Sequence, residues 1–191
     1  MSTLVLASTS KWRLQLLKDA GIDAQAVDPA VEEHALVGAT PVETAEIRAR
    51  AKAMAVAKRF PDAWILGADQ VIHLDGETIG KPGNESIWRE RLRSMRGRTH
   101  ALTTAIALWD GRDVEIQAVT THVRFRNDIT DAELDAYIAS GEAKGCAGGY
   151  MVERRGAWLV ESIDGDWLNV VGLPVLTVVG LLRARGMTVP T

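Results

Sequence analysis

Acidic side chains stand in two places where they could take part in chemistry. Asp69 lies inside the apolar run AWILGADQVI at 63–72, where an ionised carboxylate carries a desolvation cost unless it binds a cation or hydrogen-bond donors. Glu32 and Glu33 are adjacent, and such a pair either holds a divalent cation or forms a solvated acidic turn. The apolar surroundings favour a functional Asp69, whereas the acidic pair by itself favours the solvated turn.

A hydroxyl-rich loop is the third candidate. In LASTSKWR, Ser8 and Ser10 precede a helical stretch, and the free N–H groups and positive dipole end of a helix N-terminus suit a phosphate. Arg13 can add a bidentate contact to the same phosphate. An ordinary capping loop with a solvent-facing arginine has the same residues, and this segment alone slightly favours that simpler interpretation.

Two lysines supply the remaining charge. The sequence Gly80-Lys81-Pro82-Gly83 resembles a P-loop only superficially, because Pro82 stands where a hydroxyl residue is needed and removes a backbone donor. This segment is still compatible with a rigid turn that holds Lys81 toward an anion. Together with Lys52, these cations suit a polyphosphate and the carboxylates suit a metal ion, which are the parts that a nucleotide hydrolase needs.

Composition restricts the alternatives. The chain has 191 residues with 22 basic and 25 acidic side chains, and its net charge of −3 argues against a broad basic surface for nucleic acid. Its longest apolar stretch, 170–182, is interrupted by Gly, Pro and Thr and is too short to span a membrane. Cys146 is the single cysteine, so no internal disulfide forms, and we expect a cytoplasmic protein with one domain over residues 1–191.

The clearest predicted helix begins at Thr40. The segment Thr40-Pro41-Val42-Glu43 is a capping box with proline at the first helical position, which predicts that Glu43 accepts a hydrogen bond from the backbone N–H of Thr40. The helix should run to about Arg59. Its expected apolar stripe consists of small and medium-sized side chains: Ile47, Ala51, Met54 and Ala55.

Other elements follow from apolar runs, caps and Asp-Gly turns. We expect strands over 4–7 and 63–68, with Asp69 at the end of the second, and two more near 149–153 and 157–163. Hairpins are expected around Asp75-Gly76, over 71–74 and 77–79, and around Asp110-Gly111, over 100–109 and 114–126. Further helices are expected over 11–20, over 85–96 after the cap Asn84, over 130–140 with the capping box Thr130–Glu133, and over 174–185. Because helices alternate with strands and hairpins, the predicted fold class is α/β with a mixed, long-stranded sheet.

Several of these segments, in this order, resemble the Maf family of nucleoside triphosphate pyrophosphatases. The matching motifs are collinear over nearly the whole chain: LASTSKWR (6–13), VEE (31–33), RARAKA (48–53), GADQV (67–71), GKP (80–82), AGGY (147–150), VESIDGDW (160–167) and NVVGLP (169–174). The resemblance implies a strongly curved mixed sheet with flanking helices and two lobes around a cleft, as in inosine triphosphate pyrophosphatases. It also implies hydrolysis of a nucleoside triphosphate to the monophosphate and pyrophosphate with a divalent metal, Mg²⁺ or Mn²⁺.

The resemblance implies roles for individual residues. Asp69 would accept the proton of the attacking water, and Glu33 and Asp69 would hold the metal or the water. The phosphates would be bound by hydroxyl groups and cations: Ser8, Ser10, Arg13, Lys52 and Lys81. The two lysines would also take part in catalysis, because cations stabilise the charge that develops on the phosphate oxygens.

Three positions that differ between branches of the family match the branch that acts on 7-methyl-GTP: Trp12, Gln70 and Glu153. An indole face attracts a flat cation such as 7-methylguanine, and a carboxylate accepts hydrogen bonds from the guanine N1–H and 2-amino groups. Two alternatives stay open, a pyrophosphatase for dTTP and UTP and a non-catalytic nucleotide sensor that regulates cell division. Homodimerisation is also open, and we expect neither a nucleic-acid nor a membrane partner.

Overall fold

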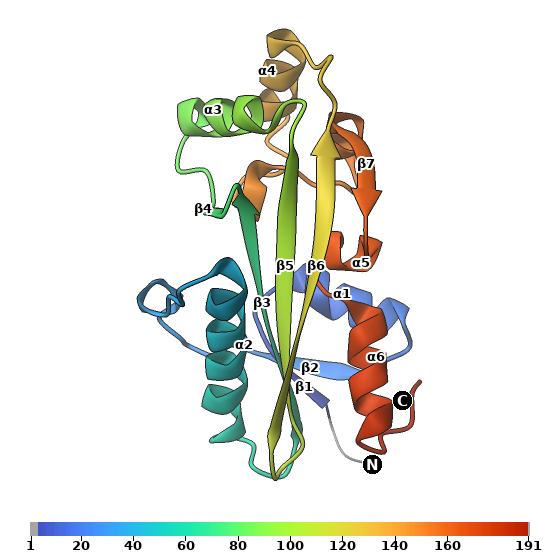
Figure 1. Ribbon diagram of the computed structural model, residues 1–191. Helices are drawn as coiled ribbons and strands as arrows, with labels where there is room; N and C mark the ends of the chain where they lie inside the picture. The colour runs from blue at the N-terminus through green and yellow to red at the C-terminus, as the bar shows by residue number, and fades with distance from the viewer. Residues whose placement is uncertain (1–3, 191) are drawn as a thin grey trace.

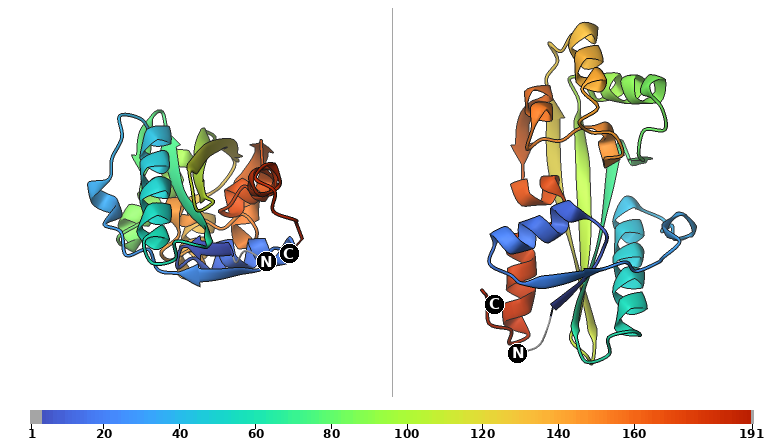
Figure 2. Two further views of the ribbon diagram at one scale, coloured as in Figure 1. Left: turned by 90° about the horizontal axis from the view of Figure 1, so that it is seen from below. Right: turned by 180° about the vertical axis from the view of Figure 1, so that it is seen from behind.

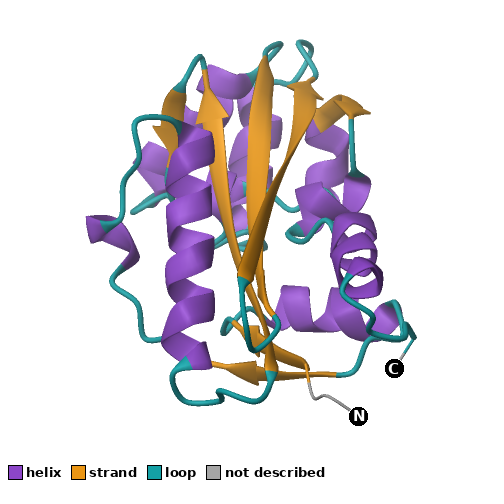
Figure 3. Ribbon diagram, turned by 60° about the horizontal axis from the view of Figure 1, so that its bottom comes forward, coloured by secondary structure: helices purple, strands orange, loops and turns teal. Residues whose placement is uncertain are grey.

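A mixed sheet forms the frame of the molecule, with helices on both of its sides (Figures 1 and 3). The structure is a computed structural model that describes residues 4–190. The seven strands of the sheet are β1 (Leu4–Ala7), β2 (Ala24–Val27), β3 (Trp64–Leu74), β4 (Glu77–Ile79), β5 (Thr99–Trp109), β6 (Val114–Phe125) and β7 (Val160–Asp164). Their order is β2-β1-β3-β5-β6-β7, with β4 paired to β3. Strand β1 runs parallel to β2 and β3, while the other pairs are antiparallel, which confirms the predicted mixed α/β class.

The helices gather at the two ends of the long strands β3, β5 and β6 (Figures 1 and 2). One end carries α3 (Glu85–Met95) and α4 (Asp131–Ala139), and the other carries α1 (Lys11–Asp19), α2 (Pro41–Ala57) and α6 (Val175–Ala184). The shorter helical segments are η1 (Glu33–Ala35), η2 (Ala147–Gly149), η3 (Arg155–Leu159) and α5 (Trp167–Val171). No helix in the described part of the chain is long and apolar enough to cross a membrane.

Separate apolar clusters stabilise the two ends. Trp88, Phe125 and Tyr137 belong to the cluster that packs α3 and α4 onto the sheet. At the other end, one cluster lies between β1, β3, α1 and α6, and another lies under α2. The polar residues of the middle of β3 therefore lie between apolar regions, where a charge is stable only with a partner.

Helix α2 packs unusually close to β3. A methyl group added to Gly67 would lie 2.3 Å from the backbone oxygen of Ala49, so this contact requires glycine. The same closeness selects alanines on the facing side of α2, where Ala45, Ala49 and Ala53 are fully buried. The predicted stripe is wrong for this reason, since Ile47 is 41% exposed and Ala51, Met54 and Ala55 are only half-buried. The helix presents its smallest side chains, not its largest, to the sheet.

Strand β3 does not end before Asp69. It continues from Trp64 to Leu74 and pairs Asp69 with Ala105 of β5, so the predicted strand over 63–68 is too short. The charge of Asp69 does not interrupt the strand because Lys52 of α2 neutralises it from above the sheet. Asp69 is thus a mid-strand residue and not a strand-end residue.

The segment from residue 147 to residue 164 also differs from prediction. No strand forms at 149–153 because Gly148 and Gly149 adopt left-handed backbone angles with φ of 75°, and the indole N–H of Trp88 donates to the oxygen of Gly149 at 2.6 Å. The strand expected over 157–163 begins only at Val160, after the helical turn η3. Strand β2 and helix α5 were not predicted.

Local capping signals are mostly confirmed. Thr130 and Glu133 form the complete capping box of α4, and Asn84 caps α3. Thr40 caps α2 as expected. The carboxylate of Glu43 accepts from the backbone N–H of Ala39 at 2.8 Å. The predicted hydrogen bond from the N–H of Thr40 is therefore wrong, because the donor is the residue before it.

Candidate active site

The predicted site residues come together around one cavity of about 670 Å³. The lining includes every residue predicted to act in catalysis, binding or specificity: Ser8, Ser10, Trp12, Arg13, Glu33, Lys52, Asp69, Gln70, Lys81 and Glu153. They come from both ends of the molecule and from segments that are distant in sequence. This placement brings cations, carboxylates and hydroxyls into one space, while the individual roles stay predictions.

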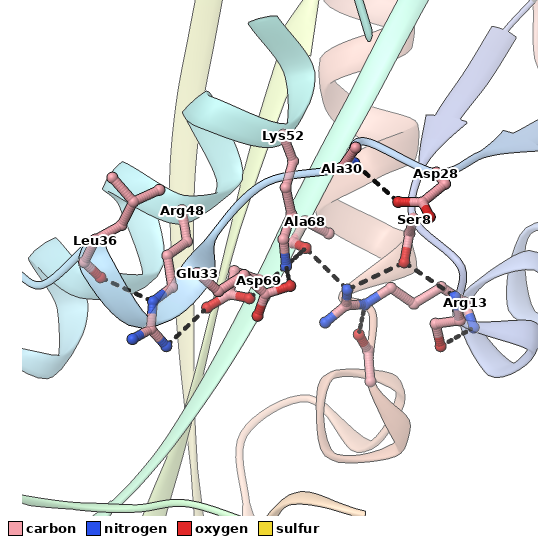
Figure 4. A network of polar contacts seen from close by, with 12 residues as sticks. Ser8, Arg13, Asp28, Ala30, Glu33, Leu36, Arg48, Lys52, Ala68 and Asp69 are labelled. Atoms are coloured by element: carbon pink, nitrogen blue, oxygen red, sulfur yellow. Dashed lines mark hydrogen bonds and ion pairs between the residues drawn. The ribbon is translucent and has the colours of Figure 1, made fainter. Parts of the chain in front are cut away.

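Lys52 is the centre of the charged part of the cavity (Figure 4). Its Nζ lies 2.6 Å from Asp69 Oδ1 and 2.9 Å from Glu33 Oε1, and it is almost completely buried. The close packing of α2 on Gly67 brings the lysine over β3. Because the ammonium group contacts both carboxylates, it holds the loop before α2 and the middle of the sheet together.

The two carboxylates differ in their surroundings. Asp69 is buried, and its Oδ2 receives no hydrogen bond in the described part of the chain, although Arg48 approaches it at 3.8 Å. Glu33 is 47% exposed. Partial burial acts to raise the pKa of Glu33, but the hydrogen bond and charge of Lys52, with weaker contributions from Arg13 and Arg48, lower it overall. Glu33 is therefore ionised near neutral pH.

Arg13 connects three segments of the cavity wall (Figure 4). Its Nε donates to the oxygen of Gly172 at 3.0 Å, and one terminal nitrogen donates to the oxygen of Ala68 at 2.8 Å and to Ser8 Oγ at 3.4 Å. Burial lowers the pKa of Arg13 while the charges of Asp69 and Glu33 oppose that change, and the guanidinium stays charged. The contacts place a fixed positive charge beside the hydroxyl loop.

The hydroxyl loop begins α1 as predicted. Ser10 is the N-cap, and its side chain accepts from the backbone N–H of Arg13 at 3.4 Å. Ser8 is buried, and its Oγ accepts from the N–H of Ser10 at 3.2 Å. Since each serine oxygen accepts in these contacts, each hydroxyl hydrogen can be donated to an anion. The loop is a capping loop and also lines the cavity, so the two interpretations of the sequence are compatible.

Another part of the cavity contains the residues predicted to set specificity. Trp12 is 42% exposed, and the guanidinium of Arg154 lies 5.2 Å from the centre of its ring. Gln70 donates to Thr104 Oγ1 and to the backbone oxygen of Asn169. Desolvation raises the pKa of Glu153, although the charge of Arg154 opposes this effect. A planar indole, an amide and a carboxylate are suitable for contacting a nucleobase.

Asp69 and Glu33 fit a divalent cation. The buried Oδ2 of Asp69 has no hydrogen bond, and carboxylate oxygens are the ligands that Mg²⁺ and Mn²⁺ prefer. In the part of the chain that the structure describes, no group of three or more His, Cys, Asp or Glu side chains gathers around a possible metal position. A cation held by two protein carboxylates would keep room for water and phosphate oxygens, which is usual for Mg²⁺.

Among the residues that contact the predicted site residues, Arg48 and Asn169 were not predicted from the sequence. Arg48 stands four positions before Lys52, which is the spacing of neighbours on one helix face, so its position was a usable signal. Asn169 contacts Gln70 through its backbone oxygen, and nothing in the local sequence indicates such a contact. Long-range backbone contacts of this kind become visible only in the fold.

A mixed α/β sheet with a cavity of paired cations and carboxylates is typical of enzymes that act on phosphorylated substrates. The chain belongs to the family described as Maf-like proteins, whose model matches residues 3–185. It is 40% identical over 186 residues to a dTTP/UTP pyrophosphatase of Dictyoglomus thermophilum, covering 96% of each chain. It is 41% identical over 192 residues to a 7-methyl-GTP pyrophosphatase of Xanthomonas campestris pv. campestris, covering 100% of each chain. Among solved structures, the Ham1 protein of Staphylococcus aureus matches with a TM-score of 0.48 and 18% identity, over 66% of this chain and 73% of that chain.

Proposed function

We propose that this protein hydrolyses a nucleoside triphosphate to the nucleoside monophosphate and pyrophosphate. The observation that carries the proposal is the buried Lys52, which contacts both Asp69 and Glu33 in a cavity that also contains Arg13 and Lys81. Membership of the Maf-like family supports the same activity, since relatives of similar identity are pyrophosphatases.

In the proposed reaction, a water molecule attacks the α-phosphorus of the substrate. Asp69 accepts the proton of that water, a new P–O bond forms, and the bond to the β-phosphate oxygen breaks so that pyrophosphate leaves. Arg13, Lys52 and Lys81 stabilise the negative charge that grows on the phosphate oxygens. The ammonium group of Lys52 lies 2.6 Å from Asp69 Oδ1, so this buried carboxylate has a cation beside it.

The proposed cofactor is Mg²⁺ or Mn²⁺, held by Asp69 and Glu33. When bound, the cation would neutralise phosphate charge and position the attacking water. The unbonded Oδ2 of Asp69 supports this assignment. Ser8 and Ser10 at the start of α1 then bind a terminal phosphate through their hydroxyls and the helix N-terminus.

The proposed substrate is 7-methyl-GTP or another modified nucleotide, with dTTP and UTP as the second candidates. Overall identity does not separate the two, because the relatives at 40% and 41% identity carry different substrate names. The support for 7-methyl-GTP is that Trp12, Gln70 and Glu153 all line the cavity, where an indole face attracts a cationic base and a carboxylate accepts from guanine.

A nucleotide panel tests the proposal. Purified protein is incubated with Mg²⁺ or Mn²⁺ and each of 7-methyl-GTP, GTP, dTTP and UTP, and release of pyrophosphate is measured. We expect the highest kcat/KM for 7-methyl-GTP. Hydrolysis of dTTP and UTP without 7-methyl-GTP contradicts the substrate, whereas tight binding of a triphosphate without release of pyrophosphate contradicts the activity and favours a sensor.

The same proposal includes the finer features of the fold. The grouping of helices at the two ends of the long strands supports two lobes around the cavity, and the proposal also includes a strongly curved sheet. A cytoplasmic location is part of this proposal, and homodimerisation stays an open alternative.

A further inference from the structure

The segment that carries Glu33 has no apolar anchor. Glu33 is the first residue of the short helical turn η1, and none of the three residues of η1 is buried. Packing into the core therefore cannot fix the place of this carboxylate, because a segment with little buried apolar surface opens at a low cost in free energy. The position of Glu33 depends on polar contacts with helix α2.

Two cations of α2 make these contacts (Figure 4). Lys52 holds the side chain of Glu33, with 2.9 Å between Nζ and Oε1. Arg48 holds the backbone of the same segment, because its Nε donates at 2.9 Å to the oxygen of Leu36, the residue that follows η1. The two cations stand four positions apart and so lie on the same face of the helix. The segment is thus held at its carboxylate and, three residues later, at its backbone.

Arg48 also reaches the strand that carries Asp69. Its Nη1 lies 3.8 Å from Asp69 Oδ2, which is too long for a hydrogen bond, and that oxygen accepts none from the residues that the structure describes. The side chain of Arg48 is 18% exposed, so the guanidinium lies mostly buried between strand β3 and the segment of η1. The arginine thus connects the surroundings of the two carboxylates and leaves the Oδ2 of Asp69 free to bind a ligand.

The two cations differ in their exposure to a substrate. Lys52 lines the cavity, so a bound phosphate would compete with Glu33 for its ammonium group. Arg48 is not among the described residues that line the cavity, and its hydrogen-bond partner is a backbone oxygen. A ligand in the cavity therefore does not compete for the bond between Arg48 and Leu36.

We infer that Arg48 is a positioning residue, whose hydrogen bond to Leu36 keeps Glu33 in place when a phosphate draws Lys52 away. It acts through Glu33 and not through contact with the substrate. The catalytic part of this inference rests on the proposed function, because it assumes that Glu33 and Asp69 act together on a nucleotide and its cation. The attachment of η1 to α2 does not depend on that assumption.

Two uncharged variants isolate the hydrogen bond. Arg48→Gln can place an amide nitrogen at the position of the arginine Nε and so can still donate to Leu36, whereas Arg48→Met has a similar length and no donor. Both variants lose the same positive charge, so a difference between them reports the hydrogen bond and not the charge. Arg50→Met is the matched control, because Arg50 is an exposed cation of the same helix.

Limited proteolysis measures the attachment of η1 without metal or nucleotide. A protease specific for glutamate cleaves after Glu32 and Glu33 only when this segment opens, so the cleavage rate follows the open population. We expect cleavage of Arg48→Met about tenfold faster than that of the parent protein, because a hydrogen bond from a charged group contributes about that factor. Arg48→Gln should be cleaved several-fold more slowly than Arg48→Met, and Arg50→Met at the parent rate.

Kinetics test the action through Glu33. Arg48→Met should lower kcat by about tenfold and change KM much less, because the residues that line the cavity are all retained. Arg48→Gln should keep most of the parent kcat. In the background of Glu33→Gln, Arg48→Met should cause little further loss, because the carboxylate that it positions is already absent.

The outcomes separate this inference from the proposed function. Equal cleavage of the parent protein and Arg48→Met would overturn the attachment, and equal defects of Arg48→Met and Arg48→Gln would assign the effect to charge and overturn the hydrogen bond. An equal loss of kcat from Arg48→Met with and without Glu33→Gln would overturn the action through Glu33. Failure of the parent protein to hydrolyse any triphosphate contradicts the proposed function, while the cleavage rates still decide the attachment. Melting temperatures of all variants show that each comparison is made on folded protein.

Discussion

At the scale of single residues, the contacts of Lys52 determine how the cavity can work. Its ammonium group lies between a buried carboxylate and a half-exposed one, so the charge of Asp69 is tolerated inside a strand. An ion pair of this kind adds little net stability, because desolvating both groups offsets their attraction. The arrangement is better explained by the proposed chemistry, since it places a carboxylate in the same cavity as the proposed phosphate-binding cations.

Replacing the carboxylate tests that explanation. Asp69→Asn keeps the size of the side chain but cannot accept a proton at neutral pH, so kcat should fall by at least about 10²-fold while the protein stays folded. Steady-state kinetics with the best substrate and circular dichroism measure the two effects. The control is Asp75→Asn at the exposed hairpin turn, where φ is 52° and asparagine is well tolerated. Near-normal turnover of Asp69→Asn would remove Asp69 from the mechanism.

His100 makes stability depend on pH. It is buried in β5, its Nε2 lies 2.7 Å from the hydroxyl of Tyr150, and burial lowers its pKa to about 4. The unfolded chain binds a proton near pH 6.5, so the free energy of unfolding should fall as pH drops from about 6.5 toward 4, by about 2 kcal/mol at pH 5. Urea unfolding at pH 7.5 and pH 5 measures this loss.

The matched variants for this prediction are His100→Gln and His34→Gln. His100→Gln removes the titrating group and should make stability depend less on pH, even if its stability at pH 7.5 is lower. His34 is exposed, so His34→Gln should retain the pH dependence of the parent protein. The same slope in all three proteins would show that His100 is not the responsible group.

At the scale of elements, the contact between α2 and β3 positions the charged residues. Gly67→Ala would place a methyl group 2.3 Å from the oxygen of Ala49, so the helix must move outward and carry Lys52 away from Asp69. We expect a loss of about 1–3 kcal/mol in the free energy of unfolding and a lower kcat. Gly180→Ala in α6 is the control, because its added methyl group meets nothing within 4 Å and should stabilise the helix slightly. Unchanged kcat in Gly67→Ala would contradict the positioning role of this contact.

The elements that were predicted correctly are those whose signals are local. Asn84 and Thr130 cap helices through residues three positions away, and the hairpins follow from Asp-Gly turns beside alternating segments. The continuation of β3 through Asp69 depends on Lys52, which lies 17 positions earlier, and a local pattern cannot contain that partner. The buried side of α2 was missed for the same reason, since Gly67 and not the helix selects alanine there.

The candidate site was predictable to a different degree. Its charged and hydroxyl residues were identified from their types and from the motifs that resemble a family, and the cavity includes all of them. The contacts that hold these residues in place were not identified from the sequence. The bond between Gln70 and Asn169 spans 99 positions, and it involves a backbone atom that every residue type possesses.

At the scale of the whole molecule, the cavity is lined by residues from both ends of the long strands. A bound nucleotide would contact the start of the chain, β3 and the segment around Glu153 at once. We therefore expect a non-hydrolysable triphosphate with Mg²⁺ to raise the melting temperature, with stabilisation of about 2.7 kcal/mol at a hundredfold excess over Kd. Thermal unfolding with and without the analogue measures the shift. A control with inorganic sulfate shows how much of the shift in melting temperature an anion alone produces. No shift with the analogue would contradict the cavity as the binding site.

The bond from Arg13 to Gly172 crosses 159 positions of the chain. During translation, the arginine leaves the ribosome long before its carbonyl partner is synthesised. A nascent polypeptide therefore carries most of its reactive side chains well before it possesses the turn that fixes them. The part of the cavity wall that this bond holds is therefore complete only after Gly172 has been synthesised.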